Sequence, residues 1–136
     1  MKTLSLLELK TSHRNQLLDI MPRVRKFLRE SNAGEGILVL FVPHTTAAIT
    51  INENADPDVK SDILSHLSRL IPEDAGFRHV EGNSDAHLKS TLVSPSLTVP
   101  VSGGKPVLGT WQSIFFCEFD GPRTRQLYLK YIPDPT

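Results

Sequence analysis

The chain has 136 residues, near the most common size of one folded domain, so we expect residues 1–136 to form a single domain. Its 15 Lys and Arg residues balance 15 Asp and Glu residues, and this neutrality argues against binding nucleic acid or an anionic membrane surface, which need concentrated positive charge. The one cysteine can form no internal disulfide, and the first residues lack the apolar run of a signal peptide. We therefore expect a cytoplasmic protein.

The first third of the sequence predicts two short strands followed by a helix. Residues 2–10 are rich in Leu, and residues 16–20 follow a polar turn, so both segments are typical of strands. A helix should begin near Asp19, because Pro22 is tolerated in a first helical turn, and Gly34 should stop it. Its spacing of apolar residues predicts that four side chains are buried, namely Met21, Val24, Phe27 and Leu28.

The middle of the chain predicts two strands and a second helix. Residues 36–42 form a continuous apolar run, typical of a strand buried on both faces, and residues 45–51 should be its partner strand. Asp56 is a suitable cap for a helix that begins at Pro57 and ends before Pro72. The apolar stripe of this helix consists of Val59, Ile63, Leu67 and Leu70.

The last part of the sequence predicts a loop, a short helix and three strands. Residues 73–85 should be mostly loop and residues 86–92 a helix. The expected strands cover residues 97–101, 107–119 and 126–132, with turns at residues 103–105 and 120–122. Strands outnumber helices, so the sequence favours an α+β fold with a largely antiparallel sheet and two to three helices.

Several simple interpretations of reactive residues find little support. Ser84 lies in no Gly-x-Ser-x-Gly turn, and the turn around Gly103 and Lys105 is too short for a phosphate-binding loop. Cys117 lies in a predicted strand, where a buried thiol is favoured over a nucleophile. Trp111 could be a stacking surface, but a core position is favoured.

Polar residues nevertheless gather at two places. Asn52 and Asn54 precede Asp56, so this segment could bind an anion at the helix N-terminus, although Asp56 also serves as a cap. Arg123 and Arg125 flank a turn and could clamp a phosphate, with surface salt bridges as the alternative.

The histidines form a second group of candidates. His44, His79 and His87 could supply imidazole ligands to zinc or another divalent ion, although no tight His-x-x-x-His pair supports this. The alternative is that they are ordinary loop and helix residues, as we expect for His13 and His66.

Three blocks of the sequence resemble a known family. They are residues 44–59 (HTTAAITINENADPDV), residues 81–90 (EGNSDAHLKS) and residues 109–115 (GTWQSIF), the last leading to Glu118. In this order they resemble the YjbQ-like proteins, often labelled secondary thiamine-phosphate synthases. The resemblance implies a compact α+β fold that assembles as a homotrimer, with polar pockets near the subunit boundaries.

The resemblance also implies roles for particular side chains. His44 would be catalytic, and Glu118 would be a carboxylate ligand or a general base. A divalent ion, zinc or magnesium, would be held by His44, His79 and His87. The small phosphorylated substrate would be bound by Asn52, Asn54, Asp56, Lys89, Arg123 and Arg125.

The family label implies that a thiazole phosphate nitrogen displaces diphosphate from an activated pyrimidine. Such a reaction needs cationic groups for the leaving diphosphate. The neutral chain offers only a modest basic set, which suggests that the labelled reaction is a side activity. The alternative is a non-catalytic module that binds a small ligand or metal, and a third interpretation is a structural partner in a larger complex.

Overall fold

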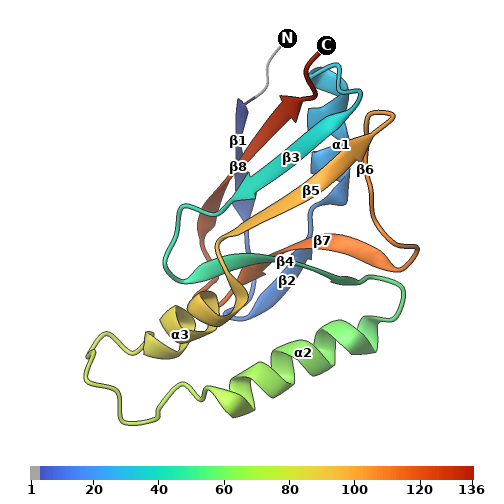
Figure 1. Ribbon diagram of the computed structural model, residues 1–136. Helices are drawn as coiled ribbons and strands as arrows, with labels where there is room; N and C mark the ends of the chain where they lie inside the picture. Colours follow the sequence, from blue (N-terminus) through green and yellow to red (C-terminus); the bar gives the residue numbers. More distant parts are fainter. Residues whose placement is uncertain (1–3) are drawn as a thin grey trace.

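A computed structural model describes residues 4–136 (Figure 1). Within this range the chain forms eight strands and three helices. The strands are β1 (Leu4–Lys10), β2 (Gln16–Asp19), β3 (Gly36–Phe41), β4 (Ala47–Glu53), β5 (Ser96–Ser102), β6 (Lys105–Pro106), β7 (Gln112–Glu118) and β8 (Thr124–Pro133). The helices are α1 (Met21–Glu30), α2 (Pro57–Leu70) and α3 (Ser84–Val93).

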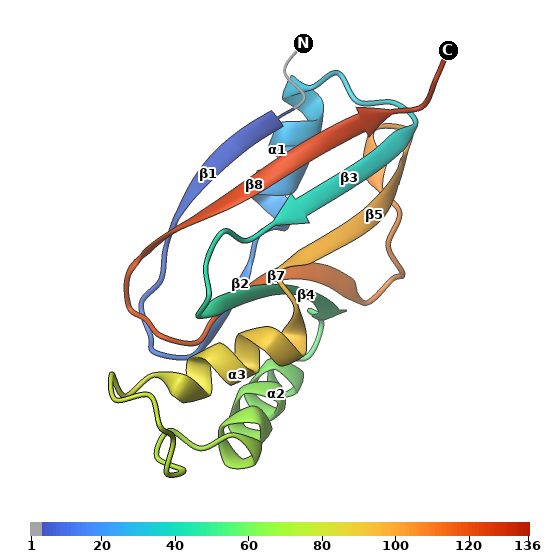
Figure 2. The same ribbon diagram turned by 60° about the vertical axis from the view of Figure 1, so that its left-hand side comes forward.

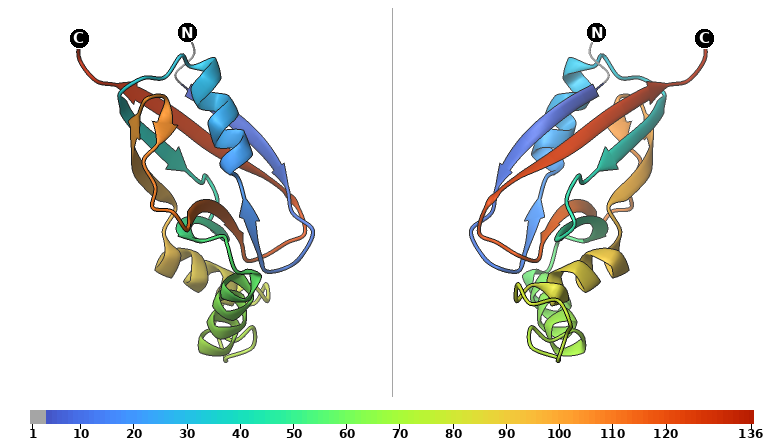
Figure 3. Two further views of the ribbon diagram at one scale, coloured as in Figure 1. Left: turned by 90° about the vertical axis from the view of Figure 1, so that its right-hand side faces the viewer. Right: turned by 90° about the vertical axis from the view of Figure 1, so that its left-hand side faces the viewer.

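The strands form two antiparallel sheets. The larger sheet has the order β1-β8-β3-β5-β6 and the smaller sheet the order β2-β7-β4. Helix α1 covers one face of the larger sheet, while α2 and α3 lie beyond the smaller sheet (Figures 2 and 3). The expected α+β fold with antiparallel sheets is therefore confirmed. No helix between residues 4 and 136 combines the length and apolarity needed to cross a bilayer.

Two apolar clusters hold these layers together. The main cluster joins α1 to the inner faces of both sheets, with Val24, Leu38 and Leu127 fully buried. A smaller cluster, which includes Cys117 and Phe119, lies between the smaller sheet and the two later helices. The thiol of Cys117 is buried, as the sequence predicted.

Helix α1 matches the sequence prediction closely. All four predicted apolar side chains are buried, and Pro22 lies in the first turn. The helix ends at Glu30, and the chain turns at Asn32, which has φ 54°, so Asn32 rather than Gly34 provides the stop. Asparagine adopts this left-handed region more readily than most residues.

The prediction that residues 36–42 are buried on both faces is wrong. Burial alternates along β3, and the side chains of Ile37 and Phe41 are 41% and 44% exposed on the outer face of the sheet. No described element covers this face (Figure 2). Strand β4 is also not the partner of β3: β3 pairs with β5 and β8, whereas β4 pairs with β7 in the other sheet. A short apolar run does not reveal which strand lies beside it.

The predicted strand at residues 107–119 is also shorter in the structure. Strand β6 ends at Pro106, before the predicted start, and pairs with β5. Residues 107–111 form no strand, and of the predicted segment only β7 lies in the smaller sheet. Between β6 and β7, Trp111 is 63% exposed, so the expected core position for this side chain is wrong. The turn after β7 leads to β8 in the other sheet and is not a hairpin.

Helix α2 begins as predicted but packs loosely. The side chain of Asp56 accepts a hydrogen bond from the Asp58 backbone N–H (2.9 Å), which confirms the cap. None of the helix residues is fully buried, and Leu70 is 62% exposed. The predicted stripe is therefore only half-buried. Helix α3 begins at Ser84, two residues before the predicted start.

Candidate functional site

Two adjoining hollows meet at the chain segment between β3 and β4. Both are lined by His44, Thr45 and Pro95. One, of about 580 Å³, is bounded further by Arg123 and Arg125. The other, of about 260 Å³, is bounded further by Ala47, His87, Ser90 and Thr91. We refer to the two together as the His44 pocket. It combines the first signature block with residues from α3 and from the start of β8.

His44 is held as a neutral imidazole at this pocket. Its Nε2 accepts a hydrogen bond from the Gln126 backbone N–H (2.9 Å), so the ring proton lies on Nδ1. Burial, together with the positive charge of Arg125, lowers the pKa of His44 below its ordinary value. No partner for Nδ1 occurs in the part of the chain that the structure describes, which leaves an N–H donor available to a ligand.

Helix α3 adds a hydroxyl with no partner. His87, Ser90 and Thr91 are three and four positions apart and therefore share the face that lines the pocket. Ser90 is 7% exposed, and its Oγ has no hydrogen-bond partner among the described residues. A buried hydroxyl without a partner is unfavourable by about 1–3 kcal/mol. A polar ligand in the pocket would relieve this cost.

A buried ion pair forms the wall of the pocket. Glu118 is 0% exposed, and its carboxylate accepts hydrogen bonds from Nε and Nη2 of Arg125. It also accepts from Thr11 Oγ1 (2.8 Å) and from the Asp120 backbone N–H (3.0 Å). Burial alone would raise the pKa of Glu118, but these hydrogen bonds outweigh it and the pKa lies below its ordinary value. Both carboxylate oxygens are occupied.

The same contacts fix the guanidinium of Arg125. Nη2 also donates to the backbone oxygen (3.1 Å) and Oγ1 (2.8 Å) of Thr46. Nη1 has no partner within residues 4–136, although Arg125 is only 2% exposed and lines the pocket. Arg123 lies beside it, with its Nε on the Asp120 carbonyl (2.8 Å) and Nη2 on the Asp120 carboxylate (3.0 Å). The predicted pair of arginines therefore faces one hollow, each with part of its guanidinium held by the protein.

A second charged network supports α3 from behind. Asp85 and Lys89 lie one turn apart on the helix and are nearly fully buried, and Lys89 Nζ is 3.4 Å from the Asp85 carboxylate. Nζ also donates to Asn15 Oδ1 (3.1 Å) and Ser68 Oγ (3.3 Å), so all three ammonium donors are used inside the protein. Arg14 connects Asp85 (3.1 Å) to Asp120 (3.5 Å). Lys89, predicted to bind substrate, thus lies in the support of the pocket.

The three predicted metal ligands lie near one another. The rings of His79 and His87 contact edge to face with centroids 5.4 Å apart, and His87 shares the pocket with His44. Nδ1 of His79 lies 3.1 Å from Ser84 Oγ, and its Nε2 is 3.6 Å from the Glu81 carboxylate. No group of three His, Cys, Asp or Glu side chains arranged to hold a metal is found among residues 4–136.

The remaining predicted residues lie at the other end of β4. Asn52 and Asn54 are separated from His44 by the whole strand, about 20 Å of extended chain. Asn52 Oδ1 accepts from the Glu53 backbone N–H, and Asp56 caps α2. The Asn54 backbone N–H donates to the carbonyl of Trp111 (3.0 Å). These residues belong to a different surface from that of the His44 pocket.

Sequence reasoning did not single out Ser90, Thr46 or Asp85. Ser90 and Asp85 stand inside the block EGNSDAHLKS, and Thr46 stands inside the first block, so the resemblance carried the signal. Their spacing on α3 would have placed Ser90 on the same face as His87. The pairing of Thr46 with Arg125 had no signal, because it joins residues 79 positions apart.

The structure is thus that of a small α+β protein with two antiparallel sheets. It has a histidine-lined pocket next to two buried charge networks. A profile of the family described as UPF0047 protein YjbQ-like matches residues 5–134. The chain belongs to this family, as its signature blocks predicted.

Relatives and solved structures agree with this assignment. A UPF0047 protein of Methanocaldococcus jannaschii is 58% identical over 127 residues, which are 93% of this chain and 92% of that protein. The UPF0047 protein YugU of Bacillus subtilis is 51% identical over 93% of this chain and 97% of its own length. The 1.31 Å crystal structure of a YjbQ/UPF0047 family protein from Clostridium acetobutylicum has a TM-score of 0.92 at 50% identity, covering 94% of this chain and 99% of that one. The crystal structure of a hypothetical protein from Aeropyrum pernix has a TM-score of 0.92 at 39% identity, covering 98% of this chain and 100% of that one.

Proposed function

We propose that this protein is an enzyme that binds a small phosphorylated substrate in the His44 pocket. The observation that carries the proposal is a set of three unpartnered donors facing one pocket: His44 Nδ1, Ser90 Oγ and Arg125 Nη1. Oxygen-rich anions are the natural acceptors for such a set, and arginine suits phosphate geometry. The donors are preorganised, because Gln126 orients the imidazole and Glu118 orients the guanidinium.

The reaction we propose is transfer with release of diphosphate, with thiamine-phosphate formation as the named case. A ring nitrogen of the thiazole phosphate forms a bond to the methylene carbon of the pyrimidine, and the bond from that carbon to the diphosphate oxygen breaks. The neutral ring nitrogen donates its lone pair and becomes the positively charged thiazolium nitrogen, and the leaving diphosphate takes the electron pair of the broken bond. The attacking nitrogen carries no proton, so none has to be removed. What the site must supply is stabilisation of the negative charge that develops on the leaving oxygen.

The residues of the pocket match this need. Arg123 and Arg125 provide positive charge beside the leaving group, and the Nδ1–H of His44 can donate to a phosphate oxygen. Glu118 then acts through Arg125 as a positioning residue, because both of its oxygens are occupied and it is fully buried. This role replaces the ligand or general-base role expected from the sequence.

The test is the steady-state rate of thiamine-phosphate formation by purified protein and by a His44→Ala variant. Loss of a preorganised donor to a developing oxyanion lowers kcat by about 10²–10³. The control is His66→Ala, at an exposed position of α2 outside the pocket. Equal rates in His44→Ala and the wild type would contradict the proposal. A kcat/KM far below about 10⁴ M⁻¹s⁻¹, with phosphate esters still bound, would make the named reaction a side activity.

A non-catalytic binding module is the second candidate. The observation that favours it is that most charged groups around the pocket are already paired inside the protein, such as Lys89 with Asp85 and Arg125 with Glu118. Tight binding of a phosphate ester without turnover, lost in Ser90→Ala, would select this candidate.

The divalent ion expected from the sequence, zinc or magnesium, stays a prediction. One chain offers His79 and His87 as neighbouring imidazoles with His44 across the pocket, but the described residues form no complete set of three ligands. Metal analysis of purified protein tests the expectation, and one zinc per chain that is lost in His87→Ala would establish it.

We also propose the homotrimer implied by the resemblance, and the outer face of the larger sheet supports it. Its register places Leu6, Tyr128 and Phe41 in one row across three strands. Five apolar side chains of this face are 41–48% exposed: Leu4, Leu6, Ile37, Phe41 and Ile132. Lys130 lies among them on the same face. A group of exposed large apolar side chains on one sheet face is typical of a surface that packs against another subunit.

A further inference from the structure

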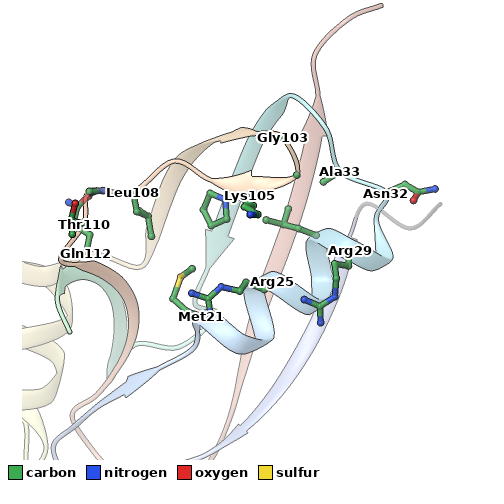
Figure 4. A pocket seen from close by; sticks show the side chains of 14 residues that line it. Met21, Arg25, Arg29, Asn32, Ala33, Gly103, Lys105, Leu108, Thr110 and Gln112 are labelled. Carbon is green, nitrogen blue, oxygen red and sulfur yellow. Dashed lines mark hydrogen bonds between the residues drawn. The ribbon is translucent and has the colours of Figure 1, made fainter. Parts of the chain in front are cut away.

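A groove on the opposite side of the molecule from the His44 pocket runs between α1 and the turn that joins β5 to β6. Its wider part encloses about 810 Å³ (Figure 4). A second part, of about 600 Å³, continues from it toward Trp111, since Met21, Arg25, Thr110 and Gln112 line both. We call the two parts together the α1 groove. No residue of the proposed phosphate site lines it.

The groove has an apolar floor and positively charged walls. Met21, Leu28 and Leu108 supply the floor. Arg25 and Arg29 lie one turn apart on α1, and Lys105 lies on the hairpin opposite them (Figure 4). Asp19 is the one carboxylate among the described residues that line the groove, and it lies at the Trp111 end.

The side chains of these three cations differ from those of the neighbouring cations on α1. On the same helix, Arg23 donates to the Glu8 carbonyl and Lys26 lies 3.8 Å from Glu30. Within residues 4–136, the side chains of Arg25, Arg29 and Lys105 make no hydrogen bond or ion pair. In a chain of net charge zero this concentrates unneutralised positive charge in one concave place.

The narrower part of the groove ends at an exposed aromatic ring. Trp111 lies in the signature block GTWQ, and Asn54 beside it lies in the first block, yet neither contributes to the His44 pocket. The hydrogen bond from the Asn54 backbone N–H to the Trp111 carbonyl fixes the loop that carries the indole. An exposed indole beside a guanidinium is suited to stacking on a flat ring.

We propose that the α1 groove is a second binding site, for an organic anion that carries an aromatic ring and a phosphate or carboxylate group. The anionic group binds to Arg25, Arg29 and Lys105, and the ring lies along Met21 toward Trp111. Asp19 keeps the anionic end away from the Trp111 end, which sets the direction of the ligand. The site is independent of the reaction proposed for the His44 pocket.

The experiment uses the full chain in its native oligomer, with phenyl phosphate as the probe. Trp111 is the only tryptophan of the chain, so its fluorescence reports on this groove alone. We expect saturable quenching by phenyl phosphate, much weaker binding of inorganic phosphate, and no binding of benzyl alcohol. The double variant Arg25→Gln/Arg29→Gln should weaken phenyl phosphate binding at least tenfold.

Two matched variants make the result specific. The double variant Arg23→Gln/Lys26→Gln removes the same charge from the same helix outside the groove, and it should bind phenyl phosphate as the wild type does. Arg123→Gln, in the His44 pocket, should leave the Trp111 signal unchanged. Absence of saturable quenching, equal loss in the two α1 double variants, or loss in Arg123→Gln would each overturn the proposal. None of these outcomes depends on turnover in the His44 pocket.

Discussion

Replacing Glu118 with glutamine tests whether the buried ion pair holds the wall of the pocket. The carboxylate accepts two hydrogen bonds on each oxygen: Thr11 Oγ1 and Arg125 Nε on one, Arg125 Nη2 and the Asp120 N–H on the other. A glutamine amide presents one oxygen and one NH₂ group in the same space. Turned with its NH₂ group toward Arg125 Nη2 and the Asp120 N–H, the amide leaves both donors without an acceptor. Turned the other way, it leaves Arg125 Nε without one, while Thr11 Oγ1 can donate to the Arg123 carbonyl. In both cases Arg125 keeps an uncompensated charge.

The expected cost follows from these contacts. One or two unsatisfied buried groups at about 1–3 kcal/mol each give about 1–6 kcal/mol. Breaking a buried ion pair by removing one partner typically costs about 3–5 kcal/mol, in the same range. For a chain of this size, such a loss lowers Tm by about 10–15 °C. Urea unfolding followed by circular dichroism, at one fixed protein concentration, measures the change in the free energy of unfolding.

The control is Glu30→Gln, which weakens an exposed pair with Lys26 and should change the free energy of unfolding by less than about 0.5 kcal/mol.

The stability difference should also depend on pH. The pKa of Glu118 is lowered in the folded state, so the stabilisation by its carboxylate is complete above its unfolded pKa of about 4.3 and is lost as the pH falls through the folded pKa. The stability gap between wild type and Glu118→Gln should therefore close in acid. A gap below about 1 kcal/mol near neutral pH would refute the reasoning.

Three further predictions concern other parts of the molecule. Lys89→Met removes one of the two cations that contact buried Asp85, since Arg14 stays 3.1 Å from it, and should lower the free energy of unfolding by about 1–3 kcal/mol in urea. Lys26→Met, at an exposed position, should have little effect, and equal changes would contradict this. Phe41→Lys places a charge on the outer face of the larger sheet. If this face holds the proposed trimer together, the variant should have the mass of a monomer in light scattering, and an unchanged mass would argue against that interface. Burial raises the pKa of the Cys117 thiol to about 12, so at about pH 8 native protein should react with a disulfide reagent far more slowly than unfolded protein. Equal rates would show that the thiol is accessible.

The elements that the sequence predicted well are those with local signals. Helix α1 follows from its apolar spacing, and the start of α2 follows from Asp56 and Pro57, because capping involves neighbouring residues only. The membership of strands in sheets had no such signal. The apolar run of β3 and the strand at residues 47–53 follow each other in the chain, yet the second pairs with β7, about 65 residues further on.

The candidate site also combines residues that the sequence identified with contacts that only the fold reveals. The resemblance placed His44 and His87 in signature blocks, and both line one pocket. The asparagines of the first block were grouped with them because they are close in sequence, but an extended strand carries them to its opposite end. The Glu118–Arg125 pair depends on a crossover between the two sheets, which no spacing in the sequence reveals.

The loose packing of α2 has a consequence for how the molecule unfolds. Helix α2 has no fully buried side chain, and beneath it lies an apolar cavity of about 440 Å³ lined by residues such as Leu17, Cys117 and Phe119. Such a helix can open as its own cooperative unit while both sheets remain folded. Amide hydrogens of α2 should then exchange sooner than those of β7 or β8. This opening is also the route by which the buried thiol would first meet solvent.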